Sequence, residues 1–118
     1  MNIEIGGNKL GDGAPCYIVA EMSGNHGGSL NRAKEIIYQA KKSGADAVKI
    51  QVYKADTMTI DCNKPDFLIP QDNPWSKYKT LYNLYDYAHT PWEWIPELID
   101  EAKKNKIDIF GSVFDVSS

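Results

Sequence analysis

A lysine inside an apolar segment is the residue of this sequence that most directly suggests chemistry. Lys49 is flanked by Val48 and Ile50, and in a β-strand it would lie on the opposite side from both, together with Gln51. A buried ammonium group is tolerated only where an anion or another polar partner meets it. Lys49 and Gln51 are therefore candidates for binding an anionic ligand. The alternatives left open are that Lys49 reaches solvent or forms a structural ion pair with Glu21.

A carboxylate closes the preceding apolar segment. Residues 17–20 predict a buried strand, and Glu21 follows them directly. A carboxylate beside a lysine can move a proton to or from water or a hydroxyl group, so Glu21 is a catalytic candidate with Lys49. The other interpretation is a solvated carboxylate at the end of a strand.

Residues 23–28 (SGNHGG) form a glycine-rich segment immediately before a predicted helix. Backbone N–H groups at a helix N-terminus can hold an anion, although this segment lacks the spacing of a dinucleotide-binding or P-loop motif. Asn25 and His26 are its candidate substrate-binding side chains. The structural alternatives are that Asn25 only stabilises the turn and that His26 packs inside the loop.

The chemistry-bearing residues fall between alternating strands and helices. Ser29 is a good N-cap, apolar residues recur at helical spacing over 30–40, and Gly44 is a natural C-terminal stop. A second strand is predicted over 47–52. The segment therefore predicts a right-handed β-α-β unit with parallel strands.

The connection after the second strand is unusually long. Residues 54–73 are polar and rich in turn residues, and long ordered loops are often functional. The aromatic and basic residues 75–79 indicate a lid or a packing segment, and helical spacing returns over 81–88. At the other end of the chain, turn residues between two short alternating runs predict a β-hairpin over 2–11.

A second long helix and a third strand complete the pattern. Residues 90–93 (TPWE) predict an N-cap, a first-turn proline and a capping box. Pro96 should bend this helix or loosen its first turn, and Asn105 should take the left-handed cap conformation. A strand over 107–110 follows.

Ser112 and Phe114 come directly after this third strand. In parallel α/β proteins, ligands gather at the carboxyl ends of the strands. We therefore expect Ser112 to lie at the same end of the sheet as Glu21 and Lys49, with Lys49 on the face that the helices do not cover.

Composition and charge argue against several classes of protein. Of 118 residues, 42% are apolar and 25% charged, a mixture typical of soluble globular proteins. The net charge of −3 argues against nucleic-acid binding, and neither a membrane span nor a secretory signal is visible. Cys16, expected to be buried, and Cys62 lie far apart and form no zinc motif, so we expect a reduced, cytoplasmic protein.

Three motifs together resemble the N-terminal barrel domain of the sialic acid synthases. Residues 20–26 (AEMSGNH), 43–51 (SGADAVKIQ) and 111–115 (GSVFD) are similar in type and order to the motifs of that family. Each motif is unspecific alone, but the three in this order are specific. Several segments between residues 66 and 94 are similar to the insert of the pseudaminic acid branch of the family.

The resemblance implies an α/β fold that is the N-terminal part of a (β/α)8 TIM barrel, preceded by the hairpin 2–11. Residues 1–118 would be a partial synthase domain with the first three barrel strands. The remaining strands and the C-terminal antifreeze-like domain of the family would be absent. We expect such a piece to be inactive alone and to form homo-oligomers, because its sheet edges and inner face would be exposed.

The activity that the resemblance implies is the condensation of phosphoenolpyruvate with an open-chain acetamido-deoxyhexose. The products are phosphate and a nine-carbon sialic-type acid, with pseudaminic acid as the expected one. A divalent metal, Mn²⁺ or Mg²⁺, would polarise the sugar aldehyde, with ligands outside this chain. By motif match, Lys49 would meet the phosphoenolpyruvate anion, Gln51 and Glu21 would line the reacting carbons and sugar oxygens, and Ser112 would donate a hydrogen bond. Asn25, His26 and Phe114 complete the predicted substrate-binding set.

Two other functions stay open. An N-acetylneuraminate or legionaminate synthase would differ in the hexose that it accepts. A non-catalytic remnant or binding module is favoured by two departures from the family pattern, because Gly111 replaces a serine and Val113 a proline.

Overall fold

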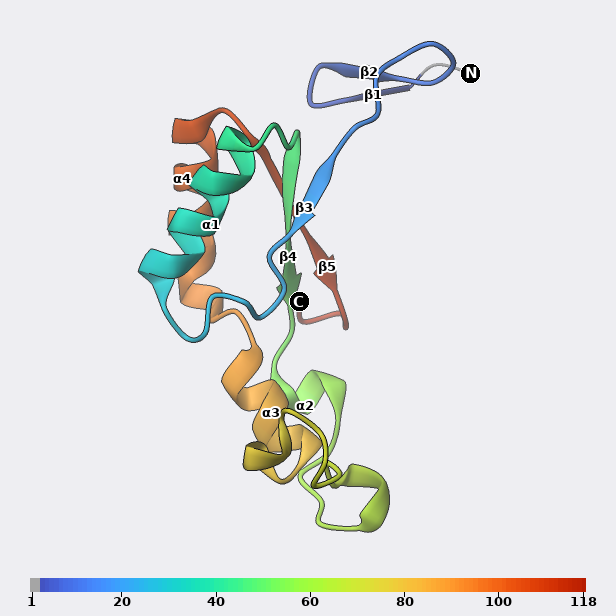
Figure 1. The fold of residues 1–118 in the computed structure, drawn as a ribbon, viewed down its shortest axis with the longest axis vertical. Helices are drawn as coiled ribbons and strands as arrows, with labels where there is room; N and C mark the ends of the chain where they lie inside the picture. Colours follow the sequence, from blue (N-terminus) through green and yellow to red (C-terminus); the bar gives the residue numbers. More distant parts are fainter. Residues whose placement is uncertain (1–2) are drawn as a thin grey trace.

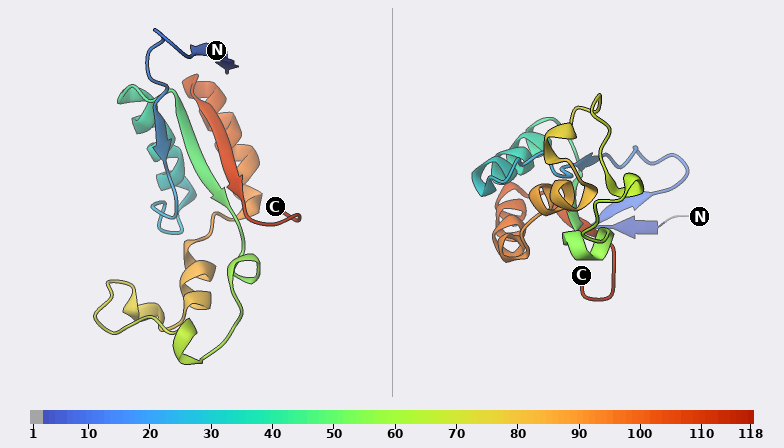
Figure 2. Two further views of the ribbon diagram at one scale, coloured as in Figure 1. Left: turned by 90° about the vertical axis from the view of Figure 1, so that its right-hand side faces the viewer. Right: turned by 90° about the horizontal axis from the view of Figure 1, so that it is seen from below.

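The computed structural model describes residues 3–118, and its centre is a sheet of three parallel strands. The strands β3 (Val19–Glu21), β4 (Ala47–Val52) and β5 (Asp108–Val113) lie side by side in that order, as Figures 1 and 2 show. The predicted parallel β-α-β arrangement is thus confirmed. The first strand begins later than expected, at Val19, and the third is longer, reaching Val113.

Helix α1 (Leu30–Lys42) forms because its sequence supplies both end signals. Ser29 Oγ accepts a hydrogen bond from Arg32 N–H at 3.3 Å, which satisfies one of the free donors of the first turn. Gly44, just beyond the helix, has a φ of +91°, a conformation that glycine adopts without strain. The predicted start and stop of this helix are confirmed.

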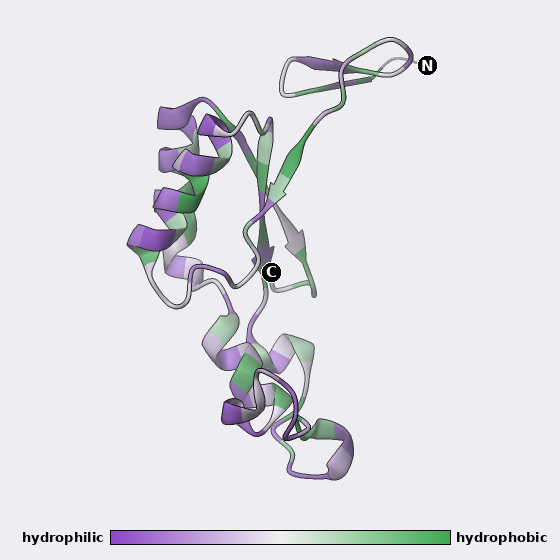
Figure 3. Cartoon of the chain, viewed as in Figure 1, coloured by the Kyte–Doolittle hydropathy of each residue, from purple (hydrophilic) through white to green (hydrophobic). Residues whose placement is uncertain are grey.

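Helices α1 and α4 (Ile95–Asn105) pack side by side over one face of the sheet (Figure 1). Their sheet-facing sides are apolar and their outer sides polar, as Figure 3 shows. The core combines three residues of β4 with residues of both helices: Val48, Ile50, Val52, Ala33, Ile37, Leu98 and Ala102. No helix or strand of residues 3–118 covers the opposite face, which we call the open face.

The start of α4 differs from the prediction. A 3₁₀ turn, Trp92–Trp94, comes first, and α4 begins at Ile95, so Pro96 lies in the first turn, where a missing N–H is harmless. The prediction of a capping box at residues 90–93 was wrong, because the Thr90 side chain is buried and bonded to His26. At the other end, Lys106 rather than Asn105 takes the left-handed conformation.

A hairpin extends beyond the amino end of the sheet. Its strands β1 (Ile3–Ile5) and β2 (Asn8–Leu10) confirm the prediction, except for residue 2, which lies outside the described residues. The segment between the hairpin and β3 is attached to the sheet by the Tyr17 hydroxyl, which donates to Asp108 Oδ2 at 2.6 Å. Cys16, on this segment, is exposed, so its predicted burial was wrong.

The insert between β4 and α4 extends beyond the carboxyl end of the sheet (Figure 2). It holds α2 (Ala55–Met58), two 3₁₀ turns (Pro65–Phe67 and Ser76–Tyr78) and α3 (Leu81–Ala88), the last as predicted. With hairpin and insert at opposite ends, the radius of gyration is 16.8 Å, compared with roughly 13–14 Å for a compact domain of this length. Within residues 3–118, no helix is long and apolar enough to cross a membrane.

Candidate active site

The alternation of β4 places its polar side chains on the open face. Val48, Ile50 and Val52 are buried under the helices, so Lys49 and Gln51 point the other way. This orientation is the one expected from the sequence, and it places both side chains where a ligand could reach them.

The pairing register brings the neighbouring strands into line with these two residues. Lys49 is paired with Glu21 of β3 on one side and with Phe110 of β5 on the other. One step further along, Gln51 is paired with Ser112. Residues 111–113 continue the regular pairing with β4, so the glycine and valine that depart from the family pattern leave the strand intact.

Lys49 and Glu21 form an ion pair on the open face. Lys49 Nζ lies 2.7 Å from Glu21 Oε2, and the two side chains are 33% and 38% exposed. The second carboxylate oxygen of Glu21 accepts a hydrogen bond from Ser23 N–H at 3.2 Å. Partial exposure keeps the net stabilisation by such a pair small. The lysine can therefore turn towards an incoming anion at little cost, while the carboxylate keeps a backbone donor.

Gln51 is bonded to the same serine of the glycine-rich segment that donates to Glu21. Its Oε1 accepts a hydrogen bond from Ser23 Oγ at 3.4 Å. Ser112 lies beside it in the sheet register, half-buried. The polar groups of four segments thus meet at the carboxyl end of the sheet, where a ligand with several oxygens would find a cation, hydroxyl donors and an amide.

His26 lies apart from this surface, because its ring is fully buried. Its Nδ1 accepts a hydrogen bond from Gly28 N–H at 3.1 Å, which leaves the proton on Nε2, and Nε2 lies 3.3 Å from Thr90 Oγ1. The ring also contacts Trp94 edge-on, at 5.4 Å between centroids. Direct substrate binding by His26 does not fit this placement; the residue instead joins the glycine-rich loop to the segment that leads into α4.

Burial is the main reason that the pKa of His26 lies below its ordinary value of 6.5, and the nearby His89 contributes a smaller repulsion. The imidazole is therefore neutral near pH 7. Protonating Nδ1 would also break the hydrogen bond from Gly28.

The other two predicted substrate-binding residues lie at the edges of the site. The Asn25 side chain is exposed and makes no hydrogen bond to another residue of the described chain. Phe114 follows β5 and packs edge-on against Tyr53, with ring centroids 5.5 Å apart. Both positions are accessible from the carboxyl end of the sheet.

A cavity of about 270 Å³ adjoins the site, and sequence reasoning missed it. Gln51, Ser23 and Asn25 form its polar side, and aromatic residues of the insert form the rest. Tyr53, directly after β4, is only 4% exposed, and it packs edge-on against Tyr85 at 6.0 Å. The sequence signal that could have indicated this cavity is the aromatic content of residues 75–87. No local pattern, however, reveals that these residues lie near the end of β4.

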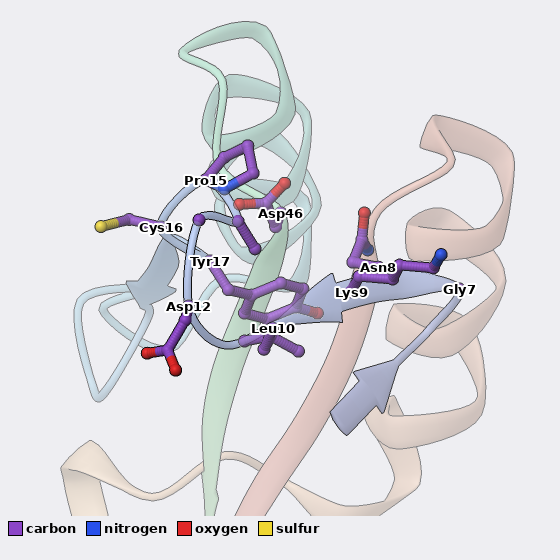
Figure 4. A pocket seen from close by; sticks show the side chains of 11 residues that line it. Gly7, Asn8, Lys9, Leu10, Asp12, Pro15, Cys16, Tyr17 and Asp46 are labelled. Atoms are coloured by element: carbon purple, nitrogen blue, oxygen red, sulfur yellow. The ribbon is translucent and has the colours of Figure 1, made fainter. Parts of the chain in front are cut away.

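A larger cavity, of about 520 Å³, lies at the opposite end of the molecule. Figure 4 shows it between the hairpin and the amino end of the sheet, with Tyr17 and Asp46 on its wall. It contains none of the predicted site residues. Because parallel α/β proteins bind ligands at the carboxyl ends of their strands, the candidate site is the one beside the smaller cavity and not this one.

Within 3–118, no three His, Cys, Asp or Glu side chains gather as a metal site would require.

Comparison with known proteins gives a consistent set of relatives. Residues 36–118, which are 83 of the 118 residues, match the NeuB family. The pseudaminic acid synthase of Campylobacter jejuni is 46% identical over 98 residues, covering 83% of this chain and 28% of that protein. The N,N'-diacetyllegionaminic acid synthase of Legionella pneumophila is 53% identical over 58 residues, covering 48% of this chain and 16% of that protein.

A solved structure agrees with these sequence relatives. The N-acetylneuraminic acid (sialic acid) synthetase of Leptospira borgpetersenii superposes with a TM-score of 0.76 and 28% identity. The match covers 99% of this chain and 35% of that chain. The present chain thus spans about a third or less of the length of these proteins.

Proposed function

Because the chain belongs to the NeuB family, we propose that it forms the first part of the (β/α)8 barrel of a sialic-type acid synthase. The barrel would be completed by strands that follow β5. Val19 and Phe110, which are 41% and 47% exposed on the open face, support this arrangement, because a closed barrel would bury them. Cytoplasmic location and homo-oligomeric assembly are part of the same proposal.

The proposed reaction joins two substrates and releases phosphate. Carbon 3 of phosphoenolpyruvate bonds to the aldehyde carbon of an open-chain acetamido-deoxyhexose, whose oxygen takes up a proton. Water adds at carbon 2, and phosphate leaves as the keto group of the new acid forms. The protein must therefore neutralise an anion and move protons at two oxygens.

The ion pair on the open face is the observation that carries the proposal. Lys49 Nζ, 2.7 Å from Glu21, can neutralise the carboxylate or phosphate of phosphoenolpyruvate. Glu21 would then exchange a proton with the attacking water or the sugar oxygen. Ser112 and Gln51, one register step along, would hold the anion in position by hydrogen bonds.

The expected divalent metal, Mn²⁺ or Mg²⁺, would supply Lewis-acid polarisation of the sugar aldehyde. On the open face, Glu21 contacts Lys49 and Ser23, and no three His, Cys, Asp or Glu side chains gather within residues 3–118. The metal ligands would come from other segments of the full-length protein.

Pseudaminic acid is the proposed product because the Campylobacter relative matches 83% of this chain, including the insert. Legionaminic acid is the second candidate, supported by the 53% identity to the Legionella synthase over 58 residues.

The test uses the full-length protein that carries this chain. Phosphate release would be measured with phosphoenolpyruvate, Mn²⁺ or Mg²⁺, and a panel of acetamido hexoses. The proposal predicts release that depends on one of the hexoses and a nine-carbon acid in the mass spectrum. Absence of hexose-dependent release with every sugar and both metals would favour the binding-module alternative instead.

A further inference from the structure

The glycine-rich loop carries a serine that contacts two polar side chains of the proposed active site. Ser23 N–H donates to Glu21 Oε1 at 3.2 Å, and Ser23 Oγ donates to Gln51 Oε1 at 3.4 Å. Ser23 has a φ of +51°, in the left-handed region that residues with a side chain rarely adopt. Such a conformation persists only where the surrounding structure holds it. The contacts that hold the loop therefore decide where the two donors of Ser23 point.

Buried residues anchor the loop on both sides of Ser23. Before it, Met22 is fully buried, and its N–H donates to Lys49 O at 2.9 Å, which extends the pairing of the sheet. After it, the ring of His26 is fully buried and lies 3.3 Å from Thr90 Oγ1. One anchor thus belongs to the sheet and the other is a side-chain contact with a distant segment.

The second anchor is formed by the connection between α3 and α4. Thr90 in this connection is fully buried, and Trp94 contacts the ring of His26 edge-on, at 5.4 Å between centroids. Gly24 lies so close to the end of α3 that a Cβ there would be 2.9 Å from the carbonyl oxygen of Ala88. The loop is therefore packed tightly against this connection, and a small shift of either would be felt by the other.

The bond between His26 and Thr90 has a defined direction. Because Nδ1 of His26 accepts from Gly28 N–H at 3.1 Å, the ring proton is on Nε2 and is donated to the threonine hydroxyl. A buried N–H without an acceptor is costly. Loss of the hydroxyl would therefore favour a displaced loop in which the imidazole reaches another acceptor, and Ser23 would move with it.

A displaced loop would affect one part of the site more than another. Glu21 would lose the backbone donor that orients its carboxylate once Lys49 turns towards an anion. Lys49 and Ser112, in contrast, are placed by the pairing of β4 with β5, to which the loop does not belong. Proton transfer by the carboxylate should therefore depend on the loop, whereas binding of the anion should not.

We infer that His26 and Thr90 are positioning residues for the proposed reaction, because their buried contact holds Ser23 against the carboxylate that transfers protons. They act through the loop and not by contact with a substrate. The inference rests on the proposed synthase function, since that function makes Glu21 the proton-transferring group.

The experiment measures kcat and the KM for phosphoenolpyruvate of the full-length protein, well below its unfolding temperature. Thr90→Val keeps the shape of the side chain and removes the hydroxyl, so kcat should fall ~10-fold. The KM for phosphoenolpyruvate should change less than about twofold. Thr90→Ser keeps the hydroxyl and should retain most of the wild-type kcat. Ser23→Ala removes the bond to Gln51 directly and should lower kcat with the unfolding temperature nearly unchanged.

Thr57→Val is the matched control, since it is the same exchange in the insert at a hydroxyl that donates to Lys54 O of its own turn at 2.9 Å. It should leave kcat unchanged. A wild-type kcat in Thr90→Val, or an equal loss of kcat in Thr90→Ser, would overturn the inference and leave the synthase function standing. So would a rise in the KM for phosphoenolpyruvate as large as the fall in kcat. No turnover by the wild-type protein with any acetamido sugar would remove the synthase function and the inference together.

Discussion

The two faces of strand β4 differ in what their residues do. Val48, Ile50 and Val52 lie under the helices and are between 0% and 7% exposed. Lys49 and Gln51, interleaved with them, lie on the open face, and Lys49 is ion-paired to Glu21. A single strand of six residues therefore serves stability on one side and binding on the other.

This division has a physical reason. Close packing makes the covered face sensitive to every lost methylene group, whereas the open face gains little stability from a half-exposed ion pair. Substitutions on the two faces should therefore separate into effects on stability and effects on activity. The predictions below test this separation, from the largest expected change in free energy to the smallest.

Leu98→Ala should have the largest effect on stability. Leu98 is fully buried between α4 and the sheet, so the substitution leaves a cavity and costs about 2–5 kcal/mol. Thermal unfolding of the full-length protein would measure the loss, and kcat at low temperature should be nearly unchanged. A loss below about 1 kcal/mol would mean that the covered face is less tightly packed than the structure indicates.

Lys49→Ala should have the largest effect on activity. Removal of the cation that faces the proposed anionic substrate should lower kcat/KM at least ~100-fold, or roughly 3 kcal/mol. Stability should change by less than about 1 kcal/mol, because the ion pair is one-third exposed. Lys34→Ala is the matched control, since it breaks an ion pair of 2.5 Å with Glu97 on the outer side of the helices. Equal activity in the two variants would remove Lys49 from the mechanism.

Local sequence signals were sufficient to predict which residues lie on the covered face and in which direction the site residues point. The cap at Ser29, the stop at Gly44 and the alternation of β4 depend only on neighbouring residues, and each was predicted. These signals also placed Lys49 on the open face. The register that pairs Glu21 with Lys49 is set by contacts between the strands and is seen only in the structure.

Long-range contacts explain what the sequence did not reveal. Thr90 has the sequence signature of an N-cap, yet its hydroxyl is bonded to His26, 64 residues earlier. The same contact buries His26, which looked like a loop residue able to meet a substrate. The aromatic cavity likewise joins Tyr53 to Tyr85 across the insert. Neither partner of such a pair carries a local pattern that identifies the other.

The buried histidine predicts a pH dependence of stability. Burial lowers the pKa of His26 in the folded state, so the unfolded state binds a proton more readily near pH 6.5. The stabilisation is fully present above about pH 6.5 and is lost as pH falls towards the folded pKa, with a slope of at most about 1.4 kcal/mol per pH unit.

Thermal unfolding between pH 5 and 8 would measure this slope, and His26→Gln should flatten it. His89→Gln is the control, because it removes a repulsion but keeps the buried ring, so the slope should persist. A wild-type slope identical to that of His26→Gln would contradict a neutral, buried imidazole.

The smallest expected effects come from substitutions at two helix caps. One cap belongs to a helix that covers the sheet, and the other to a helix of the insert. Ser29 Oγ caps α1, which covers the sheet, and Thr80 Oγ1 caps α3 in the insert, accepting from Asn83 N–H at 3.2 Å. Replacing either residue by alanine should cost about 1 kcal/mol locally. Because α1 belongs to the packed core, Ser29→Ala should lower the unfolding temperature and leave KM values unchanged. Because α3 forms a wall of the aromatic cavity, Thr80→Ala should instead raise the KM for the hexose a few-fold, an effect visible in steady-state kinetics. If both variants changed only the unfolding temperature, the position of α3 would not influence hexose binding.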